Sequence, residues 1–192
     1  MDTKAMVKEI FAKSIEVKKQ FMADEECMAA VAKAAEAMVE CYKRGGKVIV
    51  FGNGGSAADS QHLAAELVVR FEKERKSLPC VALSTNTSIL TAAANDYDFD
   101  RVFSRQIEAL AGERDVAVAI STSGNSGNVL EAAKKAGEKK MQVIALTGRD
   151  GGKLASMADI PIIVRSDVTA RIQEVHVAII HILCKVVEDS MS

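Results

Sequence analysis

The 192-residue sequence predicts an α/β protein in which helices cover both faces of a five-stranded parallel sheet. Five short apolar runs are continuous rather than alternating, which is typical of strands that are buried on both faces. Helical patterns fill the gaps between these runs, and strands that alternate with helices form right-handed βαβ units. Hydrophobic residues make up 48% of the chain and aromatic residues only 4%, which favours Ala-rich helices over buried strands and disfavours an all-β sandwich.

Two amphipathic helices are expected before the first strand, one over residues 2–22 and one from Asp24 to the Gly45-Gly46 pair. The expected strands are 47–51, 80–84, 115–121, 142–147 and 159–164. The helices expected between and after them are 57–73, 86–94, 100–112, 127–139, 152–158 and a long last helix from about Ala170 to Glu188. We expect one domain, 1–192, in which 1–45 form an N-terminal helical hairpin used in packing and oligomerisation and 46–192 form the α/β core with the C-terminal helix.

Charge and cysteine usage exclude several classes of function. With 25 Lys and Arg against 26 Asp and Glu, the chain has no overall field to hold a polyanion, so neither nucleic acid nor a membrane is an expected partner. The four cysteines lack CxxC spacing, which indicates free, buried thiols. Charged residues within the first 20 positions argue against a secretory signal, and no apolar run approaches the roughly 18 residues of a membrane span. We therefore expect a cytoplasmic protein.

Two polar loops follow strands and run directly into helices. The first is Gly52-Asn53-Gly54-Gly55-Ser56 and the second is Ser121-Thr122-Ser123-Gly124-Asn125-Ser126. Ligands of open parallel sheets bind at the carboxyl ends of strands, where glycine admits a close approach and the first helical amides attract an anion. Each loop taken alone is also compatible with ordinary helix capping. Because neither GxGxxG nor GxxxxGK[ST] occurs, a monophosphate held by neutral donors fits better than a dinucleotide or a nucleoside triphosphate.

Polar residues also interrupt two helices. His62 and Glu66 lie four residues apart on one helical face, an arrangement equally expected of a solvated surface. The last helix is apolar in nearly every direction, yet it contains His181, which lies about 80° around the axis from Gln173 and about 20° from Glu174. A buried histidine needs a partner. Either His181 is a core histidine bonded to a carbonyl, or it meets His62 and Glu66 as a metal site or an acid/base pair.

Five segments together resemble the sugar isomerase (SIS) domain family, most closely its phosphoheptose isomerases, which act on sedoheptulose 7-phosphate. They are GNGGSAADSQHLAAEL, NDYDFDRVFSRQ, STSGNSGNVL, ALTGRDGG and ARIQEVHVAIIH, and the similarity runs from about Gly45 to the last helix. The STSG motif alone would mark only some phosphosugar-binding SIS domain. The resemblance implies a flavodoxin-like α/β/α sandwich.

The resemblance also implies roles for individual residues. The residues that would bind the sugar phosphate are Asn53, Gly54, Gly55, Ser56, Glu66, Asn95, Asp96, Ser121, Thr122, Ser123, Ser126 and Gln173. Glu66 and His181 correspond to the catalytic acid/base residues of the family. Four residues correspond to the ligands of one Zn²⁺ per subunit: His62, Glu66, Gln173 and His181. The family is homotetrameric, with active sites near subunit interfaces.

The implied activity is an aldose–ketose isomerisation. It converts sedoheptulose 7-phosphate to D-glycero-D-manno-heptose 7-phosphate through an enediol, the first step of ADP- or GDP-heptose biosynthesis for lipopolysaccharide or another surface glycan. One alternative is an isomerase of another phosphosugar. A second is a non-catalytic SIS protein that associates with the replication initiator. Members of that branch lack the Glu and the last-helix His, so the presence of Glu66 and His181 favours the enzyme.

Overall fold

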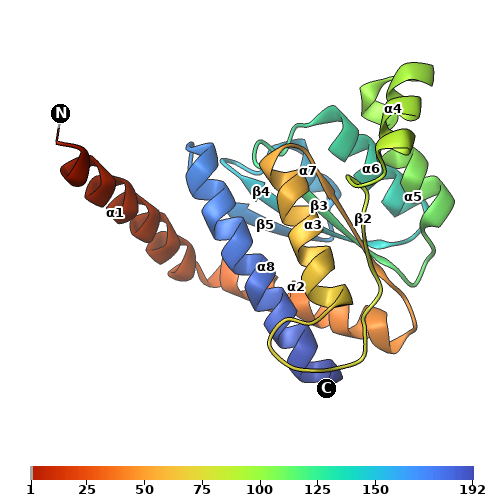
Figure 1. Ribbon diagram of the computed structural model, residues 1–192, viewed down its shortest axis with the longest axis horizontal. Coiled ribbons are helices and arrows are strands. Elements are labelled where there is room, and N and C mark those ends of the chain that lie inside the picture. The colour runs from red at the N-terminus through yellow and green to blue at the C-terminus, as the bar shows by residue number, and fades with distance from the viewer. Residues whose placement is uncertain (1) are drawn as a thin grey trace.

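All neighbouring strands of the central sheet pair in parallel, as the sequence predicts. The computed structural model describes residues 2–192 and orders the strands β2-β1-β3-β4-β5 (Figure 1). Their bounds are β1 Val48–Gly52, β2 Cys80–Ala82, β3 Val116–Ser121, β4 Gln142–Gly148 and β5 Ile160–Val164. Order reverses between β1 and β3, the adjacent strands that precede the two polar loops. A parallel sheet places its ligands at such a reversal.

Helices cover both faces of the sheet. One face packs against α2 (Glu25–Lys43), α3 (Gly55–Val68) and the long α8 (Thr169–Met191). The other packs against α4 (Thr87–Asp96), α5 (Ser104–Leu110), α6 (Gly127–Glu138) and α7 (Gly152–Met157), with a 3₁₀ turn at Phe99–Arg101. The remaining helix, α1 (Thr3–Met22), begins at an Asp2 cap and extends away from the rest of the chain (Figure 1).

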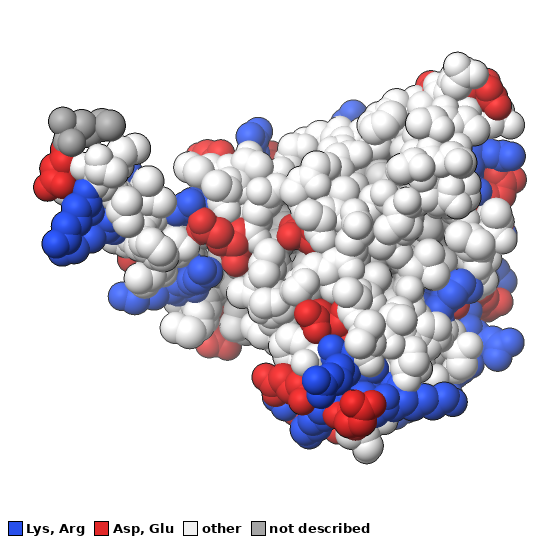
Figure 2. Space-filling model, viewed as in Figure 1, with Lys and Arg blue, Asp and Glu red and all other residues white. Residues whose placement is uncertain are grey.

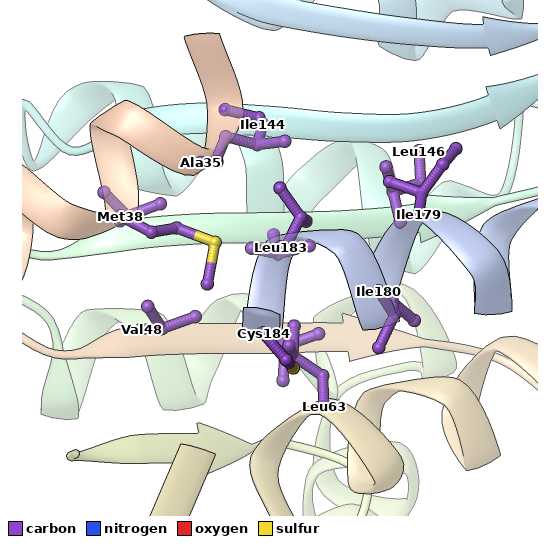
Figure 3. Packing of buried hydrophobic residues seen from close by; sticks show 14 of the residues in the cluster. Ala35, Met38, Val48, Leu63, Ile144, Leu146, Ile179, Ile180, Leu183 and Cys184 are labelled. Carbon is purple, nitrogen blue, oxygen red and sulfur yellow. The ribbon is translucent and has the colours of Figure 1, made fainter. Parts of the chain in front are cut away.

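Side chains alternate between the two faces along each central strand. In β1, Val48 and Val50 point to the layer of α2, α3 and α8, while Ile49 and Phe51 point to the opposite layer. Figure 3 shows the first layer, where Leu183 and Cys184 of α8 lie between the sheet, α2 and α3. The core is aliphatic, as the scarcity of aromatic residues indicates. Because α3 and α8 lie on the same face, their polar residues can meet.

Three helices differ from their expected bounds. The helix expected over 57–73 ends at Val68, because the backbone N–H groups of 71–73 instead donate to the buried Glu188 carboxylate. The expected helix 100–112 divides into the 3₁₀ turn and α5. The last helix continues to Met191, three residues beyond the expected end, and Met191 packs, partly buried, against the core.

The four cysteines are free and buried, as expected. Burial raises the pKa of the Cys41 thiol to about 11, so this thiol stays protonated and unreactive at neutral pH. Within residues 2–192, no helix combines the length and apolar character that crossing a membrane would require.

The core histidine of α8 is His176. Its side chain is completely buried, and its Nε2 lies 2.9 Å from the carbonyl oxygen of Thr147 in β4. Burial lowers the pKa of His176 to about 4, because the interior disfavours the charged imidazolium. The folded protein therefore holds His176 neutral under conditions in which an unfolded chain would protonate it.

We predict that His176 makes the protein less stable in acid. Below pH about 6.5 the unfolded chain binds a proton that the folded chain does not, so its contribution to the free energy of unfolding falls by about 2 kcal/mol between pH 7 and pH 5. Denaturant titrations at both pH values and one protein concentration should show this loss in the wild type and not in His176→Gln. The raised pKa of Asp59 acts in the opposite direction in both proteins and cancels in the difference. An equal loss of unfolding free energy between pH 7 and pH 5 in the two proteins would contradict the prediction.

Candidate functional site

The two polar loops lie side by side at the carboxyl ends of β1 and β3. Gly54 has a positive φ of 55° between β1 and α3, a conformation that glycine adopts without strain. Asn53 and Asn128 exchange two side-chain amide hydrogen bonds of 2.7 and 2.8 Å, which tie the loops together. Asn128 is buried in the first turn of α6. Sequence reasoning did not single it out, because an Asn in a first helical turn is equally expected of local capping.

The second loop gathers its hydroxyl groups at the N-terminus of α6. Ser121 Oγ lies 3.1 Å from Ser126 Oγ and 3.5 Å from Ser123 Oγ. Ser126 occupies the N-cap position, but its side chain faces Ser121 instead of capping the helix. The first amides of a helix lack intrahelical partners and attract anions. Neutral hydroxyls and amides are thus grouped as a monophosphate requires.

A third segment supports this serine loop. Gly124 has a φ of +64°, and a Cβ at this position would collide with the backbone of Gly151. The backbone N–H of Leu154 donates to the Gly124 carbonyl oxygen over 2.9 Å, and that of Lys153 donates to Asn125 Oδ1 over 3.2 Å. The start of α7 therefore fixes the shape of the loop.

A polar cleft of about 650 Å³ adjoins the serine loop. Its lining is Ser123, Asn125, Arg149, Asp150, Arg165, Ser166 and Asp167. Two arginines and two aspartates are among these residues, so the formal charges of the lining balance. Sequence reasoning missed this cleft, because its residues come from three separate strand ends.

His62, Glu66 and His181 meet between α3 and α8. The Nε2 atoms of the two imidazoles lie 2.8 Å apart, so one ring donates a hydrogen bond to the other. Glu66 Oε1 lies 3.7 Å from His62 Nδ1, one helical turn further along α3. The pairing places two imidazoles and a carboxylate, groups suited to proton transfer, at one point of contact. His181 bonds to a side chain of α3 here, whereas the carbonyl-bonded core histidine is His176.

The α8 face that meets α3 carries Gln173 and not Glu174. The side-chain amide of Gln173 lies against Gly55, where a Cβ would displace it, whereas Glu174 pairs with Arg171 over 2.6 Å. Angular arguments along a helix did not select Gln173, because the choice depends on where α8 lies against α3. Gln173 therefore adjoins the first loop, two helical turns before His181.

Two expected substrate-binding residues lie elsewhere. Asn95 and Asp96 end α4, are exposed, and hydrogen bond to each other over 2.9 Å. Since α4 packs on the opposite face of the sheet from α8, neither residue forms a hydrogen bond to the two loops or to His181 in the described chain, 2–192. Within one chain the structure does not bring them to the site.

Asp59 is a further acidic group of α3, and its side chain is largely buried. Burial raises the pKa of Asp59 to about 6, and its Oδ2 has no hydrogen-bond partner in residues 2–192. Helical spacing places Asp59 on the face of α3 that carries Gly55 and His62. The carboxyl group therefore adds a titratable residue to the contact between α3 and α8.

The donor types at this contact fit a zinc ion. Imidazole nitrogens and a carboxylate oxygen are ligands that zinc prefers, and the two Nε2 atoms converge on one point. Within residues 2–192, no three His, Cys, Asp or Glu side chains already stand close enough together to hold a metal ion. His62, Glu66 and His181 must therefore move toward an ion to ligate it.

Comparison with known proteins identifies the class. Residues 10–148 match the SIS domain family. "Phosphoheptose isomerase 1" of Campylobacter jejuni is 53% identical over 91% of this chain and 94% of its own length. The phosphoheptose isomerase structure from Neisseria gonorrhoeae has a TM-score of 0.91 at 47% identity, covering 97% of this chain and 99% of that one. The structure from Francisella tularensis has a TM-score of 0.94 at 41% identity, covering 98% and 100%.

The chain is therefore a SIS domain protein, a class to which the parallel sheet and the hydroxyl-rich loop also point. Within that class it belongs to the phosphoheptose isomerase family, because its similarity to those enzymes extends over nearly the whole of both chains. It is an isomerase, as the sequence resemblance implies.

We predict that the serine loop tolerates no side chain at Gly124. Gly124→Ala combines a positive φ with a backbone collision, and should lower the free energy of unfolding by about 2–4 kcal/mol. Gly137→Ala is the matched control, because that α6 position is open and helical, and it should stabilise the protein by up to about 1 kcal/mol. Denaturant titration measures the free energy of unfolding of both variants. An equal change in the two would contradict the prediction and show that the loop rearranges freely.

Proposed function

We propose that the protein interconverts sedoheptulose 7-phosphate and D-glycero-D-manno-heptose 7-phosphate. The observation that carries this proposal is the meeting of Glu66, His62 and His181 in a chain that also has a hydroxyl-lined loop at a helix N-terminus. The isomerases to which the chain is similar point to the same reaction class. We propose further that it works in the cytoplasm, in the first step of ADP- or GDP-heptose biosynthesis for lipopolysaccharide or another surface glycan.

Binding of the phosphate begins the proposed mechanism. The hydroxyls of Ser121, Ser123 and Ser126, with the first amides of α6, would hold the phosphate by hydrogen bonds. Thr122 lies in the same loop, and Ser56 and the neighbouring glycines close the other side. A phosphate at the far end of the chain from the reacting C1 and C2 supplies binding energy that fixes the flexible sugar chain for reaction.

Proton transfer between neighbouring carbons follows. Glu66 would remove a proton from C1 of the ketose, the C1–C2 enediol would form, and Glu66 would return the proton to C2 of the aldose. His181 would move the second proton from the C1 oxygen to the C2 oxygen. The 2.8 Å bond to His62 holds the His181 ring in place. In the reverse reaction the same transfers run in the opposite order.

We also propose one zinc ion per subunit, held by His62, Glu66, Gln173 and His181. The nitrogen and carboxylate donor types and the closeness of the two imidazole Nε2 atoms support this. Bound there, zinc would polarise the substrate carbonyl and stabilise enediolate charge.

Finally, we propose a homotetramer with active sites near its subunit interfaces. The outer stripe of α1 leaves Met6, Val7, Ile10, Phe11 and Ile15 exposed. The face that carries α3 and α8 shows few charges over a broad area (Figure 2), and α8 exposes Ile182 and Val186 there. Burial of these surfaces against other copies would stabilise the assembly. It would also give Asn95 and Asp96 a route to the site of another subunit.

We predict that Glu66→Gln lowers turnover of sedoheptulose 7-phosphate by about 10²- to 10⁴-fold and spares binding, because the amide cannot accept the carbon-bound proton. Product formation is followed by chromatography and substrate affinity by calorimetry. Glu36→Gln, on the exposed side of α2, is the control. Near-normal turnover in Glu66→Gln would overturn the base assignment.

The same assay tests the substrate. Wild-type protein incubated with sedoheptulose 7-phosphate should yield the aldoheptose phosphate. Faster turnover of a hexulose or arabinose phosphate would assign another phosphosugar, and binding to a replication initiator without any turnover would assign a non-catalytic role.

We predict about one zinc per subunit in protein purified without chelator or affinity metal, measured by mass spectrometry. His62→Gln and His181→Gln should each reduce the zinc content, because each removes a ligand, and should abolish the rise in melting temperature that zinc gives the wild type. His176→Gln is the matched control, because His176 binds Thr147 in the core. A metal-free and fully active wild type would contradict a catalytic ion.

We predict that the double variant Phe11→Ser, Ile15→Ser forms smaller species in sedimentation velocity, because it removes apolar area from the exposed stripe of α1. Its turnover should fall as well if a second subunit completes the site. Lys8→Ser, on an exposed polar position of the same helix, should sediment as the wild type does. A wild type that sediments as a monomer would refute the assembly.

A further inference from the structure

A buried carboxylate, remote from the two loops, organises the segment that follows α3. Glu188 lies near the end of α8 and is completely buried. Its Oε1 accepts the backbone N–H of Phe71 over 3.0 Å, and its Oε2 accepts those of Glu72 and Lys73 over 2.8 and 2.9 Å. Burial by itself would raise the pKa of Glu188, but these donors, with Arg75, hold it below its usual value. A charged Glu188 thus folds residues 71–73 around one end of α8 (Figure 1).

Arg75 connects this carboxylate to the end of α3. Its Nε lies 3.3 Å from Glu188 Oε1, which is an ion pair without hydrogen-bond alignment. Its Nη2 donates to the Glu66 carbonyl oxygen over 2.7 Å, and its Nη1 donates to the Leu67 carbonyl oxygen over 2.8 Å. The last carbonyls of a helix need such partners. The guanidinium therefore caps α3 at the residue whose side chain belongs to the candidate site.

The same segment places an aromatic ring against His181. The rings of Phe71 and His181 have their centroids 5.7 Å apart, and the rings of His62 and His181 have theirs 5.1 Å apart. His181 thus contacts a ring from α3 and a ring from the segment after it. The backbone N–H of Phe71 is one of the three that bind Glu188, so the carboxylate fixes where this ring lies.

We propose that Glu188 is a positioning residue for the isomerase site, acting through Phe71 on His181 and through Arg75 on the turn of α3 that carries Glu66. This inference rests on the proposed function of Glu66 and His181. Neither Glu188 nor Phe71 belongs to the expected substrate or zinc ligands. The proposal therefore adds a second layer of residues that sets the separation of the two reacting groups.

Kinetics of two variants test the proposal. Phe71→Ala keeps all three backbone N–H donors and should lower kcat about 10-fold with KM changed less than about 2-fold, because misplacement of a reacting group slows chemistry more than binding. Glu188→Gln should lower kcat at least as much. In the double variant kcat should match that of Glu188→Gln alone, because Glu188→Gln already removes the placement of the Phe71 ring on which Phe71→Ala acts. Phe71→Tyr, which keeps the ring, should restore kcat to near the wild-type value.

Asp189→Asn is the matched control. Asp189 is the next residue of α8, but it is exposed and pairs with Lys73 and Lys185 at the surface, so its kcat should equal that of the wild type. Should Glu188→Gln fail to fold, Phe71→Ala and Phe71→Tyr decide the question. A folded Phe71→Ala with wild-type kcat would overturn the proposal, as would losses of kcat that multiply in the double variant.

Imidazole nitrogen NMR separates this proposal from the proposed function. The chain has three histidines, and His176, bound to Thr147, serves as an internal reference. In Phe71→Ala the signals of His181 and His62 should shift while those of His176 stay. Unmoved His181 signals would overturn the positioning role even in an active enzyme. Signals that shift in Phe71→Ala, combined with a wild type that turns over no heptose phosphate, would sustain the positioning and refute the proposed reaction.

Discussion

The contact between α3 and α8 is the constraint on which the site depends. Two polar contacts lie between these helices: Gly55 against the Gln173 amide at one end, and His62 with His181 in the middle. At the other end, the buried Glu188 carboxylate of α8 pairs with Arg75 of the segment that follows α3. Between them, apolar residues such as Leu63 and Cys184 pack the helices on each other and on the sheet (Figure 3). A buried polar group requires partners, and Glu188 finds its partners outside its own helix. The contact that packs α3 on α8 is therefore the same one that brings the candidate catalytic side chains together.

The parallel sheet explains why the two polar loops adjoin this contact. Strands β1 and β3 are neighbours that lead into helices on opposite faces, so their carboxyl ends open a crevice into which the N-termini of α3 and α6 both point. The amides of Asn53 and Asn128 fasten the two loops across it. A phosphate held by hydroxyls and amides, as we propose, needs no basic patch, which agrees with the near-zero net charge of the chain.

Periodicity and loop chemistry predicted the sheet, both polar loops and the meeting of His62 with His181 as one of two alternatives. Local patterns did not predict contacts that depend on distant partners. In the sequence, Glu188 is indistinguishable from a solvated charge near a helix end. In the structure it is buried and accepts hydrogen bonds from backbone N–H groups about 115 residues earlier. Angular spacing along α8 did not select Gln173 over Glu174, because the contact of Gln173 with Gly55 depends on a helix more than 100 residues earlier. Asn95 and Asp96 lie apart from the site in one chain, and a single sequence says nothing about which surface a second copy brings near.

A crystal structure of Glu66→Gln with sedoheptulose 7-phosphate would show directly whether the serine loop and the contact between α3 and α8 form one active site, because this variant should bind the substrate without consuming it. We expect the phosphate among Ser121, Ser123 and Ser126 at the start of α6, with C1 and C2 between residue 66 and His181. A phosphate seated between Arg149 and Arg165 in the adjoining cleft, with the carbonyl end directed away from α8, would contradict this arrangement.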